Sequence, residues 1–323
     1  MIEVKHLTKR YGNHVAVADL SFTIETGKVY GFLGPNGAGK STTMNIITGC
    51  LGATDGTVLI DGHSITEEPM AAKKLIGYLP EQPPVYMDMT PVEYLRFVAQ
   101  AKGIAHKDLE AQIAYVMDKT KLGDVKNRLI RNLSKGYRQR VGIAQALLGN
   151  PEVIILDEPT VGLDPAQIIE IRELIRELGK EHTLVLSSHI LSEVQAVCDS
   201  IMIISKGHLV ASDTPENLTA LFAGSTTVNL EVKGSEDQIR TTLGQVEGIQ
   251  EMNFFDGSED STRVVLKPEK EKDIREDLFY AFAGANLPIL EMERTKASLE
   301  DVFLELTQSE ATPEETKKGR KKK

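Results

Sequence analysis

The chain has 323 residues, a length typical of about two domains. A composition of 41% hydrophobic and 26% charged residues fits a globular protein with a core, and no apolar run approaches the roughly 18–20 residues that span a bilayer. The formal net charge of −10 disfavours wholesale nucleic-acid binding, so no nucleic-acid partner is expected.

Short apolar strands and turns occupy the start of the chain. Strands are predicted at residues 2–7, 18–24, 29–34 and 75–80, with a helix at about 40–48 and a short hairpin within 51–62. The pattern changes at Thr90, where a capping residue, Pro91 and Glu93 mark a helix start. Helical spacing then continues to about residue 149. This indicates a helical insertion over about 84–150.

Buried strands return after the insertion. Continuous apolar strands are predicted at 152–159 and 182–189, a helix at 171–180 lies between them, and a hairpin at 201–211 follows. Such strands, alternating with helices, favour a parallel sheet that is covered on both faces. The first domain, residues 1–222, is therefore predicted to be of the α/β class.

Composition shifts near residue 224, which predicts a second domain over 223–308. Its order is β-α-β-β-α-β, the split-βαβ or ferredoxin-like pattern of an α+β domain. The expected strands are at 228–232, 250–255, 263–267 and 288–294, the helices at 235–246 and 272–284, and a last amphipathic helix at 298–307. The charged tail, 309–323, is predicted to be disordered. It is interpreted as a solubilising tail, with contact to anionic lipid as the alternative.

A glycine-rich motif between the third strand and the first helix predicts a phosphate site. It has the form G-x-x-x-x-G-K-[ST] and comprises Gly34, Pro35, Asn36, Gly37, Ala38, Gly39, Lys40 and Ser41. Its glycines let backbone N–H groups turn toward phosphate oxygens, and the helix N-terminus adds partial positive charge. Lys40 would reach the outer phosphates, Ser41 would ligate Mg²⁺, and Thr42 would donate to an inner phosphate. The motif alone indicates a nucleoside triphosphate.

Two adjacent carboxylates sharpen that prediction. Asp157 and Glu158 end an apolar strand, at the sheet edge where open α/β sheets bind ligands. Asp157 is expected to hold Mg²⁺ through water, and Glu158 to orient and polarise the attacking water. The pair therefore favours hydrolysis over nucleotide storage.

With these motifs, residues 1–222 resemble the ATPase subunit of an ATP-binding cassette (ABC) transporter. The resemblance implies ATP and Mg²⁺ as cofactors. It also implies that Tyr11 stacks on adenine, Gln82 senses Mg²⁺ and contacts the transmembrane partner, Asp164 belongs to a dimer-contacting loop, and His189 contacts the γ-phosphate. Each has a structural alternative: a core tyrosine, a turn glutamine, a helix start at Asp164, and a histidine beside a helix N-cap.

The stretch LSKGYRQR, beginning at Leu133, lies where that family has its LSGGQ signature. The resemblance implies that Ser134 and Gly136 cap the γ-phosphate held by a second subunit, so the chain would act as a homodimer or pair with a related ATPase. A helix N-terminus with a free hydroxyl suits an anion. Lys135 and Tyr137 depart from the family pattern.

The end of the second domain resembles ATPases that pair with type-2 ABC exporter permeases, through the SLEDVFLELT helix at 298–307. The resemblance implies export, a separate permease, and a cytoplasmic subunit held peripherally on the inner face of the cell membrane. A dimerising or stabilising role is the alternative for this domain. The alternative functions are a translation or DNA-repair ATPase of the same superfamily, and a GTPase or kinase, for which no N-K-x-D motif is found.

Overall fold

The computed structural model describes residues 1–221, 227–258, 260–269, 272–295 and 303. By their contacts these fall into two compact units, Met1–Pro215 and, within Glu216–Gln308, a second one. Among the described residues, no helix is long and apolar enough to cross a membrane. The tail and, apart from Phe303, the helix predicted at 298–307 lie outside the described residues. The predicted domain boundary after residue 222 stays a prediction.

The first unit contains two sheets, of which the N-terminal one is antiparallel with the order β2-β1-β4-β5. Its strands are β1 (Ile2–Tyr11), β2 (His14–Ile24), β4 (Asp55–Ile60) and β5 (His63–Ser64). The predicted strands are present, but the sequence reading did not separate them from the main sheet. That separation depends on β4 pairing with β1 across about fifty residues, for which short-range periodicity carries no signal.

The second sheet of this unit has the order β10-β9-β3-β8-β7-β6. All its strands except β10 run parallel to one another. The strands are β3 (Val29–Leu33), β6 (Ile76–Leu79), β7 (Val153–Asp157), β8 (Thr183–Ser188), β9 (Ser200–Ser205) and β10 (His208–Asp213). Strand β10 pairs antiparallel with β9 and forms the predicted hairpin. Strands β3 and β7, apolar except for Asp157 at the end of β7, are buried along their whole length, as the predicted parallel sheet requires.

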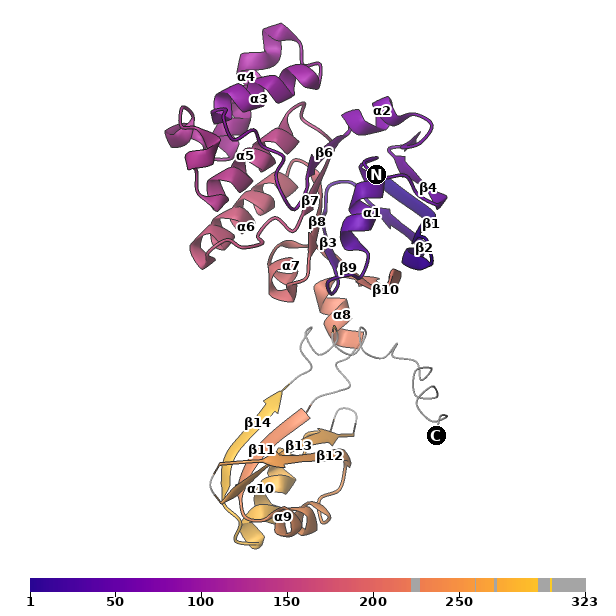
Figure 1. The fold of residues 1–323 in the computed structure, drawn as a ribbon. Coiled ribbons are helices and arrows are strands. Elements are labelled where there is room, and N and C mark those ends of the chain that lie inside the picture. Colours follow the sequence, from indigo (N-terminus) through magenta and orange to yellow (C-terminus); the bar gives the residue numbers. More distant parts are fainter. Residues whose placement is uncertain (222–226, 259, 270–271, 296–302, 304–323) are drawn as a thin grey trace, which may run out of the picture. The chain divides into compact units, whose positions relative to one another are not determined.

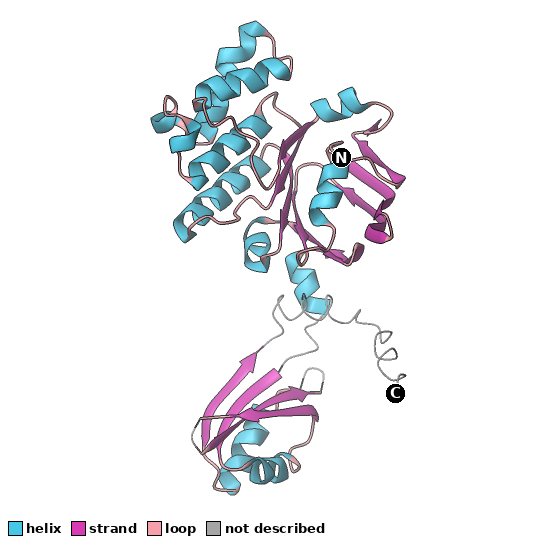
Figure 2. Ribbon diagram, viewed as in Figure 1, coloured by secondary structure: helices cyan, strands magenta, loops and turns pink. Residues whose placement is uncertain are grey.

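Helices cover both faces of the parallel sheet (Figure 1). Helix α1 (Lys40–Ile47) lies between the two sheets, and one apolar core joins it to both of them. Figure 2 shows α5 (Lys135–Leu147), α6 (Pro165–Gly179) and α7 (Leu191–Val197) on the opposite face. The sheet's carboxyl edge, where β3, β7 and β8 end, is thereby left open to a ligand.

The predicted helical insertion is present as α3 (Pro91–Ala101), α4 (His106–Lys119) and α5, with two short 3₁₀ turns before α5, at Gly123–Val125 and Ile130–Asn132. Thr90 and Glu93 form the predicted capping box. Helix α6 begins at Pro165, six residues before the predicted start at 171, because the Asp164 side chain caps it. Helices α2 (Pro69–Lys74) and α8 (Pro215–Leu221) were not predicted, and both are short.

The second unit has its six elements in the predicted order. They are β11 (Thr227–Lys233), α9 (Glu236–Leu243), β12 (Ile249–Asp256), β13 (Ser261–Pro268), α10 (Arg275–Gly284) and β14 (Ile289–Thr295). The sheet has the order β12-β13-β11-β14, and every neighbouring pair is antiparallel. Residues such as Leu230, Val264 and Phe282 pack between the sheet and its helices, so this unit has its own core.

Candidate active site

The phosphate loop connects β3 to α1, in the strand–loop–helix context that the motif requires. Gly39 is the N-cap of α1 with φ of 106°. A Cβ atom built on Gly39 would lie 2.5 Å from the carbonyl oxygen of Ala16, so both the backbone angle and the close approach require glycine. The buried Lys40 ammonium donates hydrogen bonds to the carbonyl oxygens of Gly34 (2.9 Å) and Pro35 (3.4 Å).

A cavity of about 480 Å³ opens above this loop. The predicted site residues that line it are Tyr11, Asn36, Gly37, Gly39, Lys40, Ser41, Thr42, Glu158 and His189. The Tyr11 side chain is 50% exposed, which argues against the alternative of an ordinary core tyrosine. Its ring lies at the cavity with the Lys9 ammonium 5.3 Å from the ring centroid. The remaining loop residues, Gly34, Pro35 and Ala38, shape the loop without lining the cavity.

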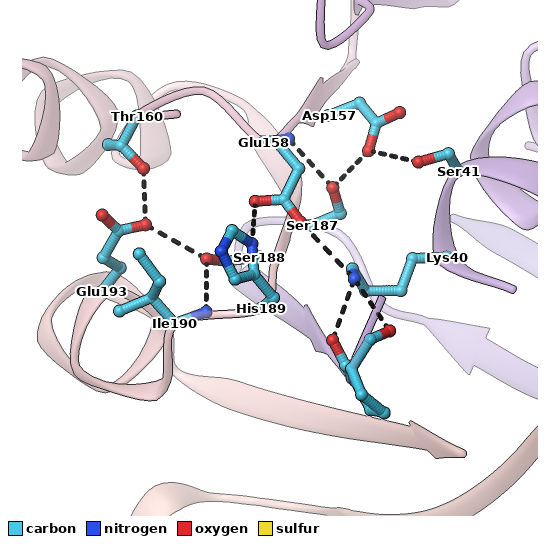
Figure 3. A network of polar contacts seen from close by, with 12 residues as sticks. Lys40, Ser41, Asp157, Glu158, Thr160, Ser187, Ser188, His189, Ile190 and Glu193 are labelled. Atoms are coloured by element: carbon cyan, nitrogen blue, oxygen red, sulfur yellow. Dashed lines mark hydrogen bonds and ion pairs between the residues drawn. The ribbon is translucent and has the colours of Figure 1, made fainter. Parts of the chain in front are cut away.

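Asp157 is the buried last residue of β7 and lies beside Ser41 and Ser187 (Figure 3). Its Oδ1 accepts hydrogen bonds from the hydroxyls of Ser41 (3.2 Å) and Ser187 (2.5 Å). A carboxylate beside a hydroxyl at a phosphate site is a set of hard oxygen donors, which fits Mg²⁺. No group of three or more His, Cys, Asp or Glu side chains gathers as a metal site in the described part of the chain. Magnesium here would therefore take its other ligands from phosphate and water.

Glu158 points into the cavity from a strained backbone. Its φ is +49°, in the left-handed region that costs a non-glycine residue about 1–3 kcal/mol unless its surroundings enforce it. The Glu158 N–H donates to both the carbonyl oxygen (3.2 Å) and the hydroxyl (3.0 Å) of Ser187. Contacts around Glu158 therefore hold its backbone in a conformation that a glutamate does not favour by itself.

The Glu158 carboxylate lies between two basic groups (Figure 3). Its Oε1 is 3.4 Å from the Lys40 ammonium and its Oε2 is 2.9 Å from His189 Nδ1. A carboxylate oxygen accepts hydrogen bonds, so Nδ1–H of His189 is the donor in this contact. Three residues from three separate segments thus meet at one end of the cavity.

A second group of predicted site residues lies outside that cavity. Ser134 is the N-cap of α5, and its exposed hydroxyl accepts from the Tyr137 N–H at 3.4 Å. Gly136 is buried, and a Cβ there would lie 2.7 Å from Gln167 Oε1. Asp164 caps α6 by accepting from the Gln167 N–H at 2.9 Å. The start of α5 and the start of α6 are therefore adjacent.

Gln82 also belongs to this second region. It lines a hollow of about 340 Å³ together with Lys135, Arg138, Gln139 and other residues, whereas its neighbour Glu81 lines both this hollow and the larger cavity. The sequence did not single out Glu81. A charged residue immediately before the predicted loop glutamine was the available signal.

Two further residues of the site were not predicted from the sequence. Ser187 holds Asp157 and the Glu158 backbone, and Glu193 connects the segments that follow β7 and β8. Ser187 had a recognisable signal, a polar residue at the end of the apolar strand at 182–189. Glu193 had no such signal, because its contact with Thr160 joins residues that are far apart in the sequence.

Comparison with known proteins places this geometry in a family. The family model described as "ABC transporter" matches residues 17–161. The linearmycin resistance ATP-binding protein LnrL of Bacillus subtilis is 30% identical over 308 residues, covering 95% of this chain and 98% of LnrL. The lantibiotic transport ATP-binding protein SrtF of Streptococcus pyogenes is 37% identical over 226 residues, covering 69% of this chain and 96% of SrtF.

A solved structure agrees with these relatives. The dimeric structure of MJ0796, a bacterial ABC transporter cassette, is 26% identical, with a TM-score of 0.61, and the match covers 66% of this chain and 98% of that one. A phosphate-loop GTPase or kinase is therefore wrong for this chain. The chain belongs to the ABC transporter family as an ATP-binding subunit, and it is an ATPase.

Proposed function

We propose that Glu158 is the general base of ATP hydrolysis in this subunit. The observation that carries the proposal is the position of its carboxylate, which lies in the cavity within reach of both Lys40 and His189. A water between this carboxylate and a γ-phosphate would be oriented for in-line attack. Lys40 would exchange its carbonyl partners for phosphate oxygens, and His189 would contact the γ-phosphate.

The other parts of the nucleotide would bind along the phosphate loop and the cavity. Backbone N–H groups of 34–39 would hold phosphate oxygens, Thr42 an inner phosphate, and Tyr11 would stack on the adenine. Ser41 and Asp157 would hold Mg²⁺, which supplies charge neutralisation on the phosphates. Gln82 faces the neighbouring hollow, so contact with Mg²⁺ would require the loop at 80–87 to move on nucleotide binding.

Glu158→Gln tests the assignment of the base. The variant should bind ATP as the wild type does and lose hydrolysis by about a hundredfold or more, because the amide cannot take a proton from water. Glu81→Gln is the matched control, since Glu81 lines the same cavity but, in the described part of the chain, forms no ion pair with Lys40 or His189. Steady-state phosphate release would decide. Normal turnover in Glu158→Gln would remove Glu158 from the reaction.

We propose further that two cassettes complete each site, as a homodimer or with a related ATPase. Ser134, Gly136 and Asp164 form a group that does not line the phosphate cavity of their own chain. The start of α5 offers unpaired N–H groups and a hydroxyl, which suit the γ-phosphate bound by a second copy. A two-fold dimer would pair each phosphate loop with the partner's α5.

An exposed aromatic patch is our candidate surface for the permease. Tyr86 and Phe97 are 51% and 44% exposed with ring centroids 5.3 Å apart, and Met87 beside them is 43% exposed. Exposed apolar side chains gathered in this way mark interaction sites. Tyr86 and Met87 lie four and five residues after Gln82, and Phe97 lies on α3. A permease docked here would hold the subunit at the inner face of the cell membrane.

Export is the transport direction that the relatives favour. LnrL is named for resistance and SrtF for lantibiotic transport, and the similarity to LnrL extends over 95% of this chain, thus into the second unit. We propose that this unit is a ferredoxin-like domain, because β11–β14 are all antiparallel and have β11 and β13 at the centre of the sheet. Co-expression with a permease encoded by a neighbouring gene, followed by measurement of cargo efflux, would test the direction of transport. Uptake in place of efflux would contradict it.

A further inference from the structure

The residues proposed to act on the γ-phosphate lie on two separate segments. Glu158 directly follows β7 and His189 directly follows β8, and these strands are neighbours in the parallel sheet. Strands β7 and β8 pair as far as Asp157 and Ser187, and the Glu158 N–H also donates to Ser187. The relative position of the residues that follow, Thr160 on one segment and His189 on the other, depends on further contacts.

Glu193 contacts both segments (Figure 3). It lies on α7, its side chain is buried, and its Oε2 accepts a hydrogen bond from the Thr160 hydroxyl at 2.5 Å and another from the Ser188 hydroxyl at 3.1 Å. Thr160 lies two residues after Glu158, and Ser188 lies one residue before His189. One carboxylate oxygen therefore bridges the two segments, and none of the three bridging residues lines the cavity.

The bridge continues into the backbone. The Ser188 hydroxyl also accepts the Ile190 N–H at 3.0 Å, so the residues on both sides of His189 are fixed by the same side chain. Among the described residues Glu193 has no ion pair, and Thr160 and Ser188 are themselves buried. Burying a carboxylate without a cation is costly, so the two hydroxyl donors matter to its stability.

We infer that Glu193 is a positioning residue that sets the distance between Glu158 and His189. The strained backbone of Glu158 persists only where its surroundings enforce it, and Glu193 anchors the chain two residues downstream. A displacement of about 1 Å at a catalytic group can cost about a hundredfold in rate. The inference rests on the proposed function, because it presumes that Glu158 and His189 both act on ATP.

The test compares Glu193→Ala with Glu193→Gln in the full chain. Glu193→Ala should lower kcat by at least about tenfold while KM for ATP and nucleotide binding change by less than about twofold, because the phosphate loop is untouched. Glu193→Gln should recover activity to within about threefold of the wild type, since both hydroxyls donate to a single oxygen that an amide carbonyl can replace. Ser192→Ala, at an exposed position on the same helix, is the control and should be neutral.

Thr160→Val removes one side of the bridge and serves if Glu193→Ala does not fold. It should lower kcat with KM preserved, and adding it to Glu193→Ala should cause no further loss, because both changes remove one interaction. A kcat within threefold of the wild type in both single variants would overturn the inference. So would Glu193→Gln being as impaired as Glu193→Ala.

Glu158→Gln in the same assay distinguishes a failure of the proposed general base from a failure of the positioning inference. If Glu158→Gln turns over normally, the proposed base is wrong whatever Glu193 does. If Glu158→Gln is inactive and the Glu193 variants are normal, only the positioning inference fails.

Discussion

Gly39 shows how a single residue fixes the phosphate loop. Its φ of 106° is unfavourable for any side chain, and an added Cβ would meet the backbone of Ala16 at 2.5 Å, which cannot swing away as a side chain would. Gly12 also has a positive φ, +58°, but open space around it. Substitutions at Gly12 and Gly39 therefore distinguish the cost of backbone strain from the cost of a steric clash.

Gly39→Ala should therefore lose more stability than Gly12→Ala. The Gly12 variant should cost about 1–2 kcal/mol from the left-handed backbone alone, and the Gly39 variant clearly more because the loop must also shift. Thermal unfolding of both variants, with a nucleotide-binding measurement beside it, checks this. Equal melting temperatures in the two variants would mean that the contact with Ala16 relaxes freely.

The positions of the site residues were predictable from sequence to the extent that their signals are local. Lys40, Ser41, Asp157 and Glu158 belong to short motifs whose spacing implies their chemistry. Ser187 contacts Glu158, and Glu193 contacts Thr160, across about thirty residues, and the sequence pattern does not show that these residues meet. Lys135, which the family resemblance left unexplained, has its ammonium against Gly162, 2.2 Å from where a Cβ of that glycine would lie.

At the level of elements, the N-terminus of α5 combines a stabilising cap with the proposed contact to a second copy. Ser134 caps the helix, so its hydroxyl contributes about 1 kcal/mol to the stability of the unit. Ser134→Arg should leave ATP binding to a monomer nearly intact and abolish dimer-dependent hydrolysis, because a long cationic side chain would fill the space for the second copy's phosphate. Hydrolysis measured against protein concentration reports this.

Ser134→Thr is the matched control, since threonine keeps the capping hydroxyl with one added methyl group. It should retain most of the hydrolysis that Ser134→Arg loses. Persistent hydrolysis in Ser134→Arg would reduce α5 to a structural helix with no role toward a partner.

Most elements were predictable because their signals lie within about fifteen residues. The capping box at Thr90 located α3, and apolar runs located β3, β7 and β8. Partition into two sheets was not predictable, because it depends on which distant strands pair. The helix was predicted from 171, with a helix start at Asp164 only as an alternative, because the buried apolar face of α6 begins at Ile171 whereas Ile169 in its first turns is exposed.

At the scale of the whole chain, the two units carry separate cores, so conditions that weaken one need not weaken the other. The second unit contains a carboxylate that tests this. Glu231 is held by the hydroxyls of Ser258 and Ser261, the Ser258 N–H and the Arg263 guanidinium, and these contacts lower its pKa to about 2. The ionised form is therefore favoured by folding.

Acid should weaken the second unit through Glu231. A carboxyl whose pKa is lower in the folded state adds stability above its ordinary pKa near 4.5 and loses it as pH falls toward 2. Hydrogen exchange of the full chain should show strand β11 less protected in Glu231→Gln than in the wild type at pH 6, with the difference shrinking between pH 4.5 and 2. Glu251→Gln, at an exposed position on β12, is the control and should match the wild type throughout. A constant difference in protection between Glu231→Gln and the wild type across that range would show that the shape rather than the charge of Glu231 stabilises the sheet. A parallel loss of protection in β3 would show that the two units do not respond independently.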